Sequence, residues 1–276
     1  MNRIEFAWKN ARGLKIYASE WRPDAGPRGV VAVVHGLGEH VGRYQHVADA
    51  LNQAGYGVIG FDLAGHGRSE GVRGHATYDG VLEDIDRLLR EAAERYPNKP
   101  CFLYGHSLGG ALTLYYALKR RPALNGFIAT SPGLYPGAPV PPVKLLLAKV
   151  MAAVKPDFTM QNELDVNNLS RDTAIVQAYK DDPLVHGKIS TRLGLDLVTK
   201  GAWVQEQAAH FPGPLLLMQG DCDYLVSQQA LSRFAEAVPA EKLTYKVWPG
   251  SYHETHNDLE KQQVIQTMID WLDSHL

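Results

Sequence analysis

The segment Gly105-His106-Ser107-Leu108-Gly109 places a serine between two glycines in the pattern G-x-S-x-G. In enzymes that use this pattern, the serine lies on a sharp turn between a buried strand and a helix. Here the apolar run 101–104 precedes the motif and a helical periodicity over 109–120 follows it. The positive end of such a helix favours an oxyanion that develops beside the hydroxyl. The pattern therefore predicts Ser107 as the nucleophile of an acyl-transfer reaction, against the alternative of a glycine-rich turn with an incidental serine.

A serine hydroxyl is a weak nucleophile at neutral pH and needs an adjacent base. In this setting the acid and then the histidine follow the serine along the chain. We expect Asp223, just beyond the apolar run 214–218, to be the acid, with Asp221 as the alternative. We expect His253, which follows the next strand-like run, to be the base, with His256 as the alternative.

Two backbone N–H groups must stabilise the oxyanion, and losing one such donor costs ~10²–10³ in rate. One is expected from Leu108, which follows the nucleophile, and the other from a loop after an early strand. That loop is 35–40, in which glycines flank Leu37, so the N–H of Leu37 is the predicted second donor. His35 is expected to brace the loop through a structural hydrogen bond.

Apolar runs bounded by glycine alternate with helical periodicities along most of the chain. The expected strands are 30–34, 57–61, 101–104, 127–130, 214–218 and 243–248, and the expected helices are 44–54, 81–96, 109–120 and 262–276. Continuous apolar runs are typical of buried parallel strands, and alternation of strands with helices indicates right-handed crossovers. The segment 4–21 is expected to form an antiparallel edge hairpin. The predicted fold class is α/β: an α/β-hydrolase fold, with a doubly wound, mostly parallel sheet and a helical cap insertion.

The alternation stops after residue 131, where several prolines occur and helical patterns without a strand signal follow. A segment of this length is too long for a plain loop. We therefore expect residues 132–210 to form a helical cap, or lid, inserted into a core made of residues 1–131 and 211–276. The amphipathic pattern at 143–154 favours either a membrane-facing helix or packing on the core.

Bulk properties exclude several classes of protein. The 276 residues include 28 basic and 30 acidic side chains and carry a net charge of −2, so no basic surface for nucleic acid is indicated. The 11 histidines are dispersed without a metal-ligand spacing, so neither a metal nor a cofactor is expected. Residues 1–21 lack a signal-like apolar run and no run of 18 apolar residues occurs. These features predict a cytoplasmic protein with reduced cysteines, and any association with a membrane is expected to be peripheral.

The motifs together resemble those of the monoacylglycerol lipase and lysophospholipase family. They are His35-Gly36-Leu37-Gly38-Glu39-His40, Gly42-Arg43-Tyr44, the run 62–71, Gly105 to Gly110, Asp181-Asp182-Pro183-Leu184 and Gly250-Ser251-Tyr252-His253-Glu254. The resemblance implies a serine hydrolase that releases one fatty acid from glycerol or a related head group, and a cap that touches membranes transiently. It implies Ser107, Asp223 and His253 as the triad. Glu39, Arg43 and His256 match positions near the family's alcohol pocket, with an exposed loop salt bridge as their alternative role.

Other functions remain open at this level because the fold hosts many reactions. The alternatives are a lysophospholipase, a short-chain or aryl esterase, a proline-type peptidase and a non-catalytic ligand-binding protein. Leu37 stands where the family often has alanine, which leaves the substrate preference open. Oligomeric state and acyl-chain length are not determined by these patterns.

Overall fold

A single eight-stranded sheet organises the computed structural model, which describes residues 2–137 and 141–276. Its order is β1-β2-β4-β3-β5-β6-β9-β10. The bounds are β1 (Asn2–Lys9), β2 (Lys15–Arg22), β3 (Gly29–Val34), β4 (Tyr56–Phe61), β5 (Cys101–His106), β6 (Gly126–Thr130), β9 (Leu215–Gly220) and β10 (Leu243–Trp248). β1 and β2 form the expected antiparallel edge, and β2 also pairs antiparallel with β4. The other neighbouring strands are parallel.

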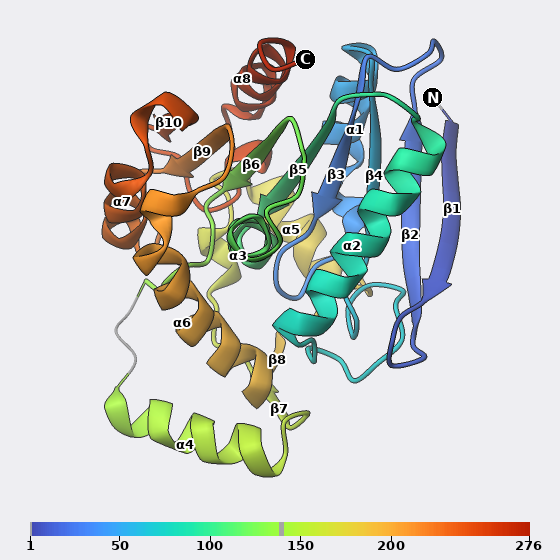
Figure 1. Cartoon of the computed structure of the whole chain (residues 1–276). Helices are drawn as coiled ribbons and strands as arrows, with labels where there is room; N and C mark the ends of the chain where they lie inside the picture. The colour runs from blue at the N-terminus through green and yellow to red at the C-terminus, as the bar shows by residue number, and fades with distance from the viewer. Residues whose placement is uncertain (1, 138–140) are drawn as a thin grey trace.

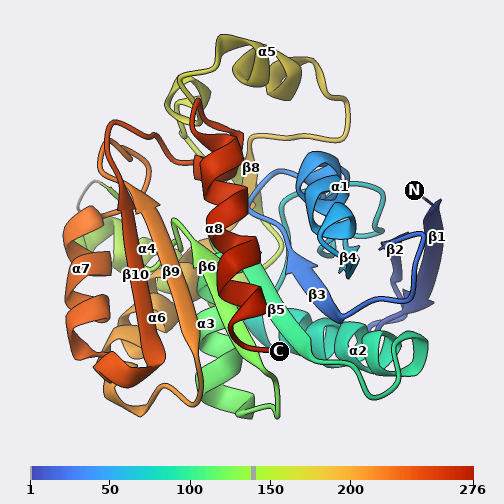
Figure 2. The same cartoon turned by 90° about the horizontal axis from the view of Figure 1, so that it is seen from above.

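Helices cover both faces of this sheet (Figure 1, Figure 2). On one side lie α1 (Gln45–Gln53) and α8 (Lys261–Asp273); on the other lie α2 (Tyr78–Arg95), α3 (Leu108–Arg120), α6 (Thr191–Glu206) and α7 (Gln228–Ala237). Short 3-10 turns add η1 (Val41–Tyr44), η4 (Ala240–Lys242) and η5 (Thr255–Asn257). The predicted doubly wound α/β fold is confirmed.

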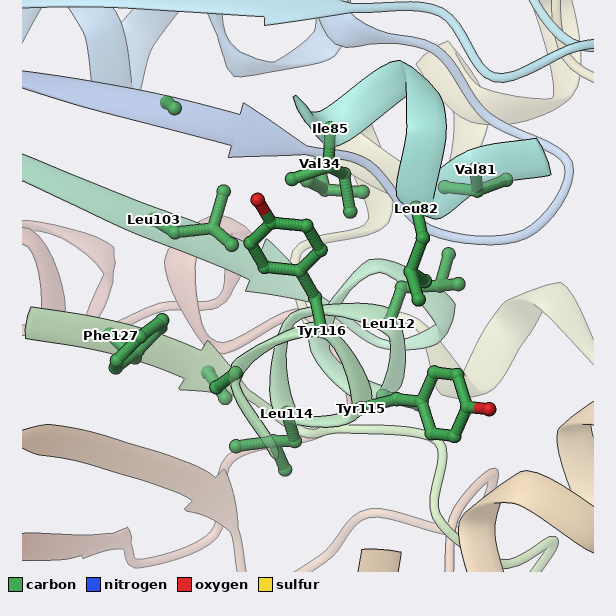
Figure 3. Close-up of a cluster of buried hydrophobic side chains, with 14 of the residues drawn as sticks. Val34, Val81, Leu82, Ile85, Leu103, Leu112, Leu114, Tyr115, Tyr116 and Phe127 are labelled. Carbon is green, nitrogen blue, oxygen red and sulfur yellow. The ribbon is translucent and has the colours of Figure 1, made fainter. Parts of the chain in front are cut away.

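The two-residue repeat of the strands divides the core into two layers. In β3, Val34 faces the layer that contains α2 and α3, and Val33 faces the layer of α1 and α8. Leu103 and Tyr104 of β5 divide in the same way. Figure 3 shows the first layer, where Leu112 and other side chains of α3 meet those of α2 and the strands. Because both sheet faces are buried, β3 and β5 are apolar along nearly their whole length.

Side-chain caps explain where several helices begin. Thr77 accepts a hydrogen bond from the Gly80 N–H and starts α2, whereas the apolar periodicity predicts a start at residue 81. Ser190 and Ser227 cap α6 and α7 in the same manner. A cap of this kind stabilises a helix by about 1 kcal/mol. Helix starts thus follow the cap residue rather than the first apolar position.

The segment between β6 and β9 departs from the strand–helix alternation. It contains α4 (Pro142–Val154), β7 (Thr159–Gln161), η2 (Val166–Asn168), α5 (Thr173–Asp181), β8 (Lys188–Ser190), α6 and η3 (Ala208–His210). The expectation of no strand here is wrong, because β7 and β8 pair antiparallel. Each is three residues long, too short for a two-residue repeat to stand out. Of the predicted insertion 132–210, residues 138–140 lie outside the described residues.

α4 packs against α6 at the end of the molecule away from α8 (Figure 1). Within the described part of the chain, no helix is both long and apolar enough to cross a bilayer.

Candidate active site

Ser107 occupies a strained turn between β5 and α3. Its backbone angles are φ 53° and ψ −118°, a region that costs a non-glycine residue about 1–3 kcal/mol. The flanking glycines make the turn possible. A Cβ on Gly105 would lie 2.1 Å from the Gly109 carbonyl oxygen, and one on Gly109 would lie 2.0 Å from the Val34 carbonyl oxygen. The strain is therefore imposed by β3, β5 and α3 and lifts the Ser107 side chain off the end of the sheet.

The predicted acid and base lie beside this serine. His253 Nε2 is 2.8 Å from Ser107 Oγ, and His253 Nδ1 is 2.7 Å from Asp223 Oδ2. Ser107 follows β5, Asp223 follows β9 and His253 follows β10, so all three residues lie just beyond the carboxyl ends of parallel strands of the sheet. Both His253 and Asp223 are buried. This arrangement is what a base needs to take a proton from Ser107 while a carboxylate fixes its tautomer.

The charges of Asp223 and His253 support each other. Burial alone lowers the pKa of His253, but the Asp223 carboxylate outweighs burial and raises this pKa above its ordinary value. Burial alone raises the pKa of Asp223, yet His253 and the N–H groups of Leu225 and Val226 lower it. Asp223 is therefore ionised at neutral pH and favours the imidazolium that proton transfer creates.

The alternative residues have other contacts. Asp221 Oδ1 accepts the Gly250 N–H at 2.5 Å, which ties β9 to the loop after β10. His256 is buried and stacks on the Tyr44 ring at a centroid distance of 5.2 Å. His35 Nε2 accepts the Leu63 N–H at 2.9 Å, and burial lowers its pKa to about 3. His35 thus braces the loop as a neutral residue, in the manner expected from the sequence.

The loop that carries Leu37 is held from both ends. The Gly36 N–H donates to Glu39 Oε1 at 2.6 Å, and the Gly38 carbonyl accepts the His186 N–H at 2.9 Å. Among the residues that the structure describes, neither the Leu37 N–H nor the Leu108 N–H has a hydrogen-bond acceptor. Both residues line the space beside Ser107. Two unpaired N–H groups next to a serine hydroxyl form a suitable site for an oxyanion.

Two cavities meet at Ser107 and His253. The first, of about 230 Å³, has the more polar wall of the two and is called the polar cavity. Its polar side chains are Glu39, His106, Gln161, Asn162, Glu163, Tyr179 and Glu254. The second, of about 200 Å³, is mostly apolar. Its apolar side chains are Leu37, Leu108, Tyr135, Pro136, Leu164, Ile189, Leu197, Val198, Leu225 and Val226. A molecule with one polar and one apolar end would fit with its junction at the serine.

The three tentative substrate contacts separate in the structure. Glu39 lines the polar cavity, but Arg43 and His256 are not among the described lining residues. Arg43 instead donates to Glu39 at 2.5 Å and to both oxygens of Glu254, at 2.7 and 2.8 Å. This matches the alternative of a salt bridge, with the difference that it is buried rather than exposed.

Sequence reasoning missed the walls of the cavities. The α6 positions Gly194, Leu197 and Val198 face the apolar cavity at spacings of three and four residues, a pattern that a helical projection of α6 would have revealed. Asn162 follows the short strand β7 and has no such signal, whereas Tyr179 lies on the buried face of α5. In the part of the chain that the structure describes, no group of three or more His, Cys, Asp or Glu side chains is arranged to hold a metal.

The fold and the serine–histidine–aspartate arrangement are those of the α/β-hydrolases. The family model described as serine aminopeptidase, S33, matches residues 25–260. The chain is 36% identical over 276 residues to a monoacylglycerol lipase of Mycolicibacterium smegmatis, with 99% of this chain and 98% of the relative covered. It is 31% identical to a Homo sapiens monoglyceride lipase, with 91% and 83% covered.

A solved structure supports the same grouping. The monoacylglycerol lipase of Paleococcus ferrophilus has a TM-score of 0.88 and 34% identity, covering 95% of this chain and 99% of that one. An uncharacterised Dictyostelium discoideum relative is 38% identical, but the chain spans only 27% of its length. The chain belongs to the S33 family of α/β-hydrolases, within the group of the monoacylglycerol lipases.

Proposed function

We propose that the protein is a monoacylglycerol lipase in which Ser107 is the nucleophile, His253 the base and Asp223 the orienting acid. The observation that carries the proposal is the contact of Ser107 with His253 at the junction of a polar and an apolar cavity. The glycerol end would occupy the polar cavity and the acyl chain the apolar one.

The reaction would proceed in two steps. His253 takes the Ser107 proton as Oγ attacks the ester carbonyl. The oxyanion that forms accepts hydrogen bonds from the N–H groups of Leu37 and Leu108. His253 then protonates the leaving glycerol oxygen. Water hydrolyses the acyl-enzyme by the same path and restores Ser107.

The polar cavity favours a neutral head group over the alternatives. No lysine or arginine is found among its described lining residues, whereas Glu39 and Glu254 are. A lysophospholipid phosphate would face these carboxylates without a cationic partner. A peptide N-terminus would meet carboxylates that already bind Arg43. A polyol needs only hydrogen-bond partners, and Asn162 and Tyr179 offer them.

We infer that residues 132–210 act as a cap over a core of residues 1–131 and 211–276, and that α4 contacts lipid surfaces. Five apolar side chains of α4 are exposed: Val143, Leu146, Leu147, Val150 and Val154. An exposed apolar patch of this kind is typical of an interaction site. Contact through α4 would deliver an insoluble substrate to the apolar cavity, part of whose wall is formed by α6.

The experiment is a series of monoacylglycerols of different chain length, compared by kcat/KM with a lysophospholipid, a short aryl ester and a prolyl amide. We expect turnover of the monoacylglycerols and a loss of several orders of magnitude in Ser107→Ala. Fluorophosphonate labelling should modify Ser107 stoichiometrically. Labelling at another residue would overturn the assignment of the nucleophile, and faster turnover of the lysophospholipid would overturn the assignment of the head group.

A further inference from the structure

A short segment between β6 and β9 is bonded directly to the loop that carries His253. We call residues 168–172 the strap. The Asn168 carbonyl accepts the His253 N–H at 3.4 Å, and the Leu169 carbonyl accepts the Glu254 N–H at 2.8 Å. Ser170 Oγ donates to the Asn257 carbonyl at 3.0 Å. The strap therefore runs alongside the His253 loop and is bonded to it at three successive residues.

Arg171 fastens the strap through a buried carboxylate. Its N–H and its Nε donate to the two oxygens of Asp258, at 2.9 and 3.0 Å, and its guanidinium also pairs with Glu260. Asp258 is fully buried and accepts the Tyr252 N–H at 2.7 Å. Asp258 thus joins the residue just before His253 to the strap. A planar guanidinium that contacts carboxylates in fixed geometry restrains position more strongly than a single point charge.

Arg171 does not belong to the site itself. It is not among the described residues that line either cavity, so it does not meet a substrate in them. From these contacts we infer that Arg171 is a positioning residue, and that the strap sets the placement of His253 relative to Ser107. The inference rests on the proposed function, because it assigns His253 the role of base.

A displacement of about 1 Å in a catalytic group is enough to lower a rate about 100-fold. Arg171→Met keeps an apolar stem and removes the guanidinium from Asp258, which retains only its backbone N–H donors and Ser170. We expect kcat to fall about 10- to 100-fold with little change in KM, and fluorophosphonate labelling of Ser107 to slow in parallel. Arg171→Lys should recover part of the lost rate, since an ammonium replaces the charge but not the planar geometry.

The pH dependence of kcat/KM distinguishes a displaced His253 from a simple loss of stability, because a loss of stability alone would not shift the acid limb. The groups that face His253 are Asp223, His106, Glu254 and Glu39, and Arg171→Met changes none of them. Asp223 raises the pKa of His253. If the loop shifts, the Asp223 contact weakens, and the acid limb of kcat/KM should move to lower pH.

Arg192→Met is the matched control. Arg192 Nε pairs with the buried Asp196 at 2.9 Å within α6, and the described contacts of Arg192 include no bond to the His253 loop. Both variants should lose thermal stability, but only Arg171→Met should change kcat and the acid limb. An unchanged kcat and acid limb in Arg171→Met would overturn the inference.

If Arg171→Met does not fold, Ser170→Ala provides the same test, because it removes one hydrogen bond to the His253 loop. We expect its kcat to fall about threefold or more. An unchanged kcat would overturn the inference. Activity of Ser107→Ala separates the two proposals. If Ser107→Ala is active, the proposed function fails. If it is inactive and the strap variants are normal, only the strap inference fails.

Discussion

At the residue scale, Asp221 and Asp223 differ in what their carboxylates reach. Asp221 accepts a backbone N–H from Gly250, and Asp223 contacts the His253 ring. The sequence places both aspartates after the same apolar run. Chain order and the strand–turn–helix setting led to Ser107, His253 and Asp223, but the choice between the two aspartates depends on how the chain turns after β9. That turn is fixed by tertiary hydrogen bonds, which a periodicity does not encode.

Asp223→Asn should lower kcat by ~10³–10⁴ and move the acid limb of kcat/KM to lower pH. His253 must be neutral to accept the Ser107 proton, and the Asp223 carboxylate raises the pKa of His253. In the wild-type enzyme, the midpoint of the acid limb of kcat/KM should therefore lie above the ordinary histidine pKa. An amide removes this charge, so the histidine stays neutral at lower pH. The measurement is kcat/KM from pH 5 to 9.

The control for this prediction is Asp221→Asn. Its carboxylate bonds the Gly250 N–H, so we expect a modest loss of stability and an acid limb at the wild-type pH. A large shift in Asp221→Asn, with none in Asp223→Asn, would reverse the assignment of the acid.

At the element scale, the strands and the long helices were predictable because each buries a continuous or periodic apolar face. The strand β10 (Leu243–Trp248) has the predicted bounds, and α3 begins one residue before the predicted start. β7 and β8 were missed, and so was the strap. Each has only a few residues, and its position depends on contacts with distant segments: β7 with β8, and Leu169 with Glu254. Short elements of this kind carry no pattern of their own.

The α4 helix should matter for substrates in aggregates and not for dissolved ones. Leu146 and Leu147 are 64% and 59% exposed, so replacing both by glutamine removes little buried surface and should change the melting temperature only slightly. If α4 enters lipid, the double variant loses the transfer free energy of two leucines, and turnover of a long-chain monoacylglycerol in vesicles should fall about tenfold or more. Turnover of a soluble butyrate ester should stay at the wild-type value.

Leu276→Gln is the control for the α4 variant, because Leu276 is an exposed leucine outside α4: it is 46% exposed and follows α8. It should change neither assay. Equal losses on vesicles and on the soluble ester in the α4 variant would point to a damaged cavity instead of a lost lipid contact.

At the scale of the whole molecule, a set of buried neutral histidines around the site makes the stability of the fold depend on pH. Burial lowers the pKa of His35 to about 3 and that of His106 to about 4, and it lowers the pKa of His66 and His256 well below the ordinary value. The unfolded chain binds protons at these histidines near pH 6.5. Below that pH the unfolded state therefore holds more protons than the folded state, and stability falls as the pH is lowered.

The free energy of unfolding should accordingly decrease from pH 7 to pH 5. Each buried neutral histidine contributes a slope of up to about 1.4 kcal/mol per pH unit below pH 6.5, until its folded pKa is reached. His253 acts in the opposite sense: its pKa is raised, so its stabilisation is complete below pH 6.5 and is lost as the pH rises through the folded value. Burial also raises the pKa of Asp62 and that of Asp84, the latter to about 6, so both act in the same sense as His253. These three groups are outnumbered by the seven histidines whose pKa is lowered: His35, His46, His66, His75, His106, His186 and His256. Urea titrations at pH 7, 6 and 5 measure the slope. His256→Phe should reduce the slope by the contribution of one histidine. The phenyl ring can keep the stack on Tyr44, and the substitution breaks no bond of His256 Nδ1, which has no partner among the described residues. A free energy of unfolding that stays constant over this range would contradict the prediction. It would mean that these histidines are protonated in the folded protein and not neutral around Ser107 and His253.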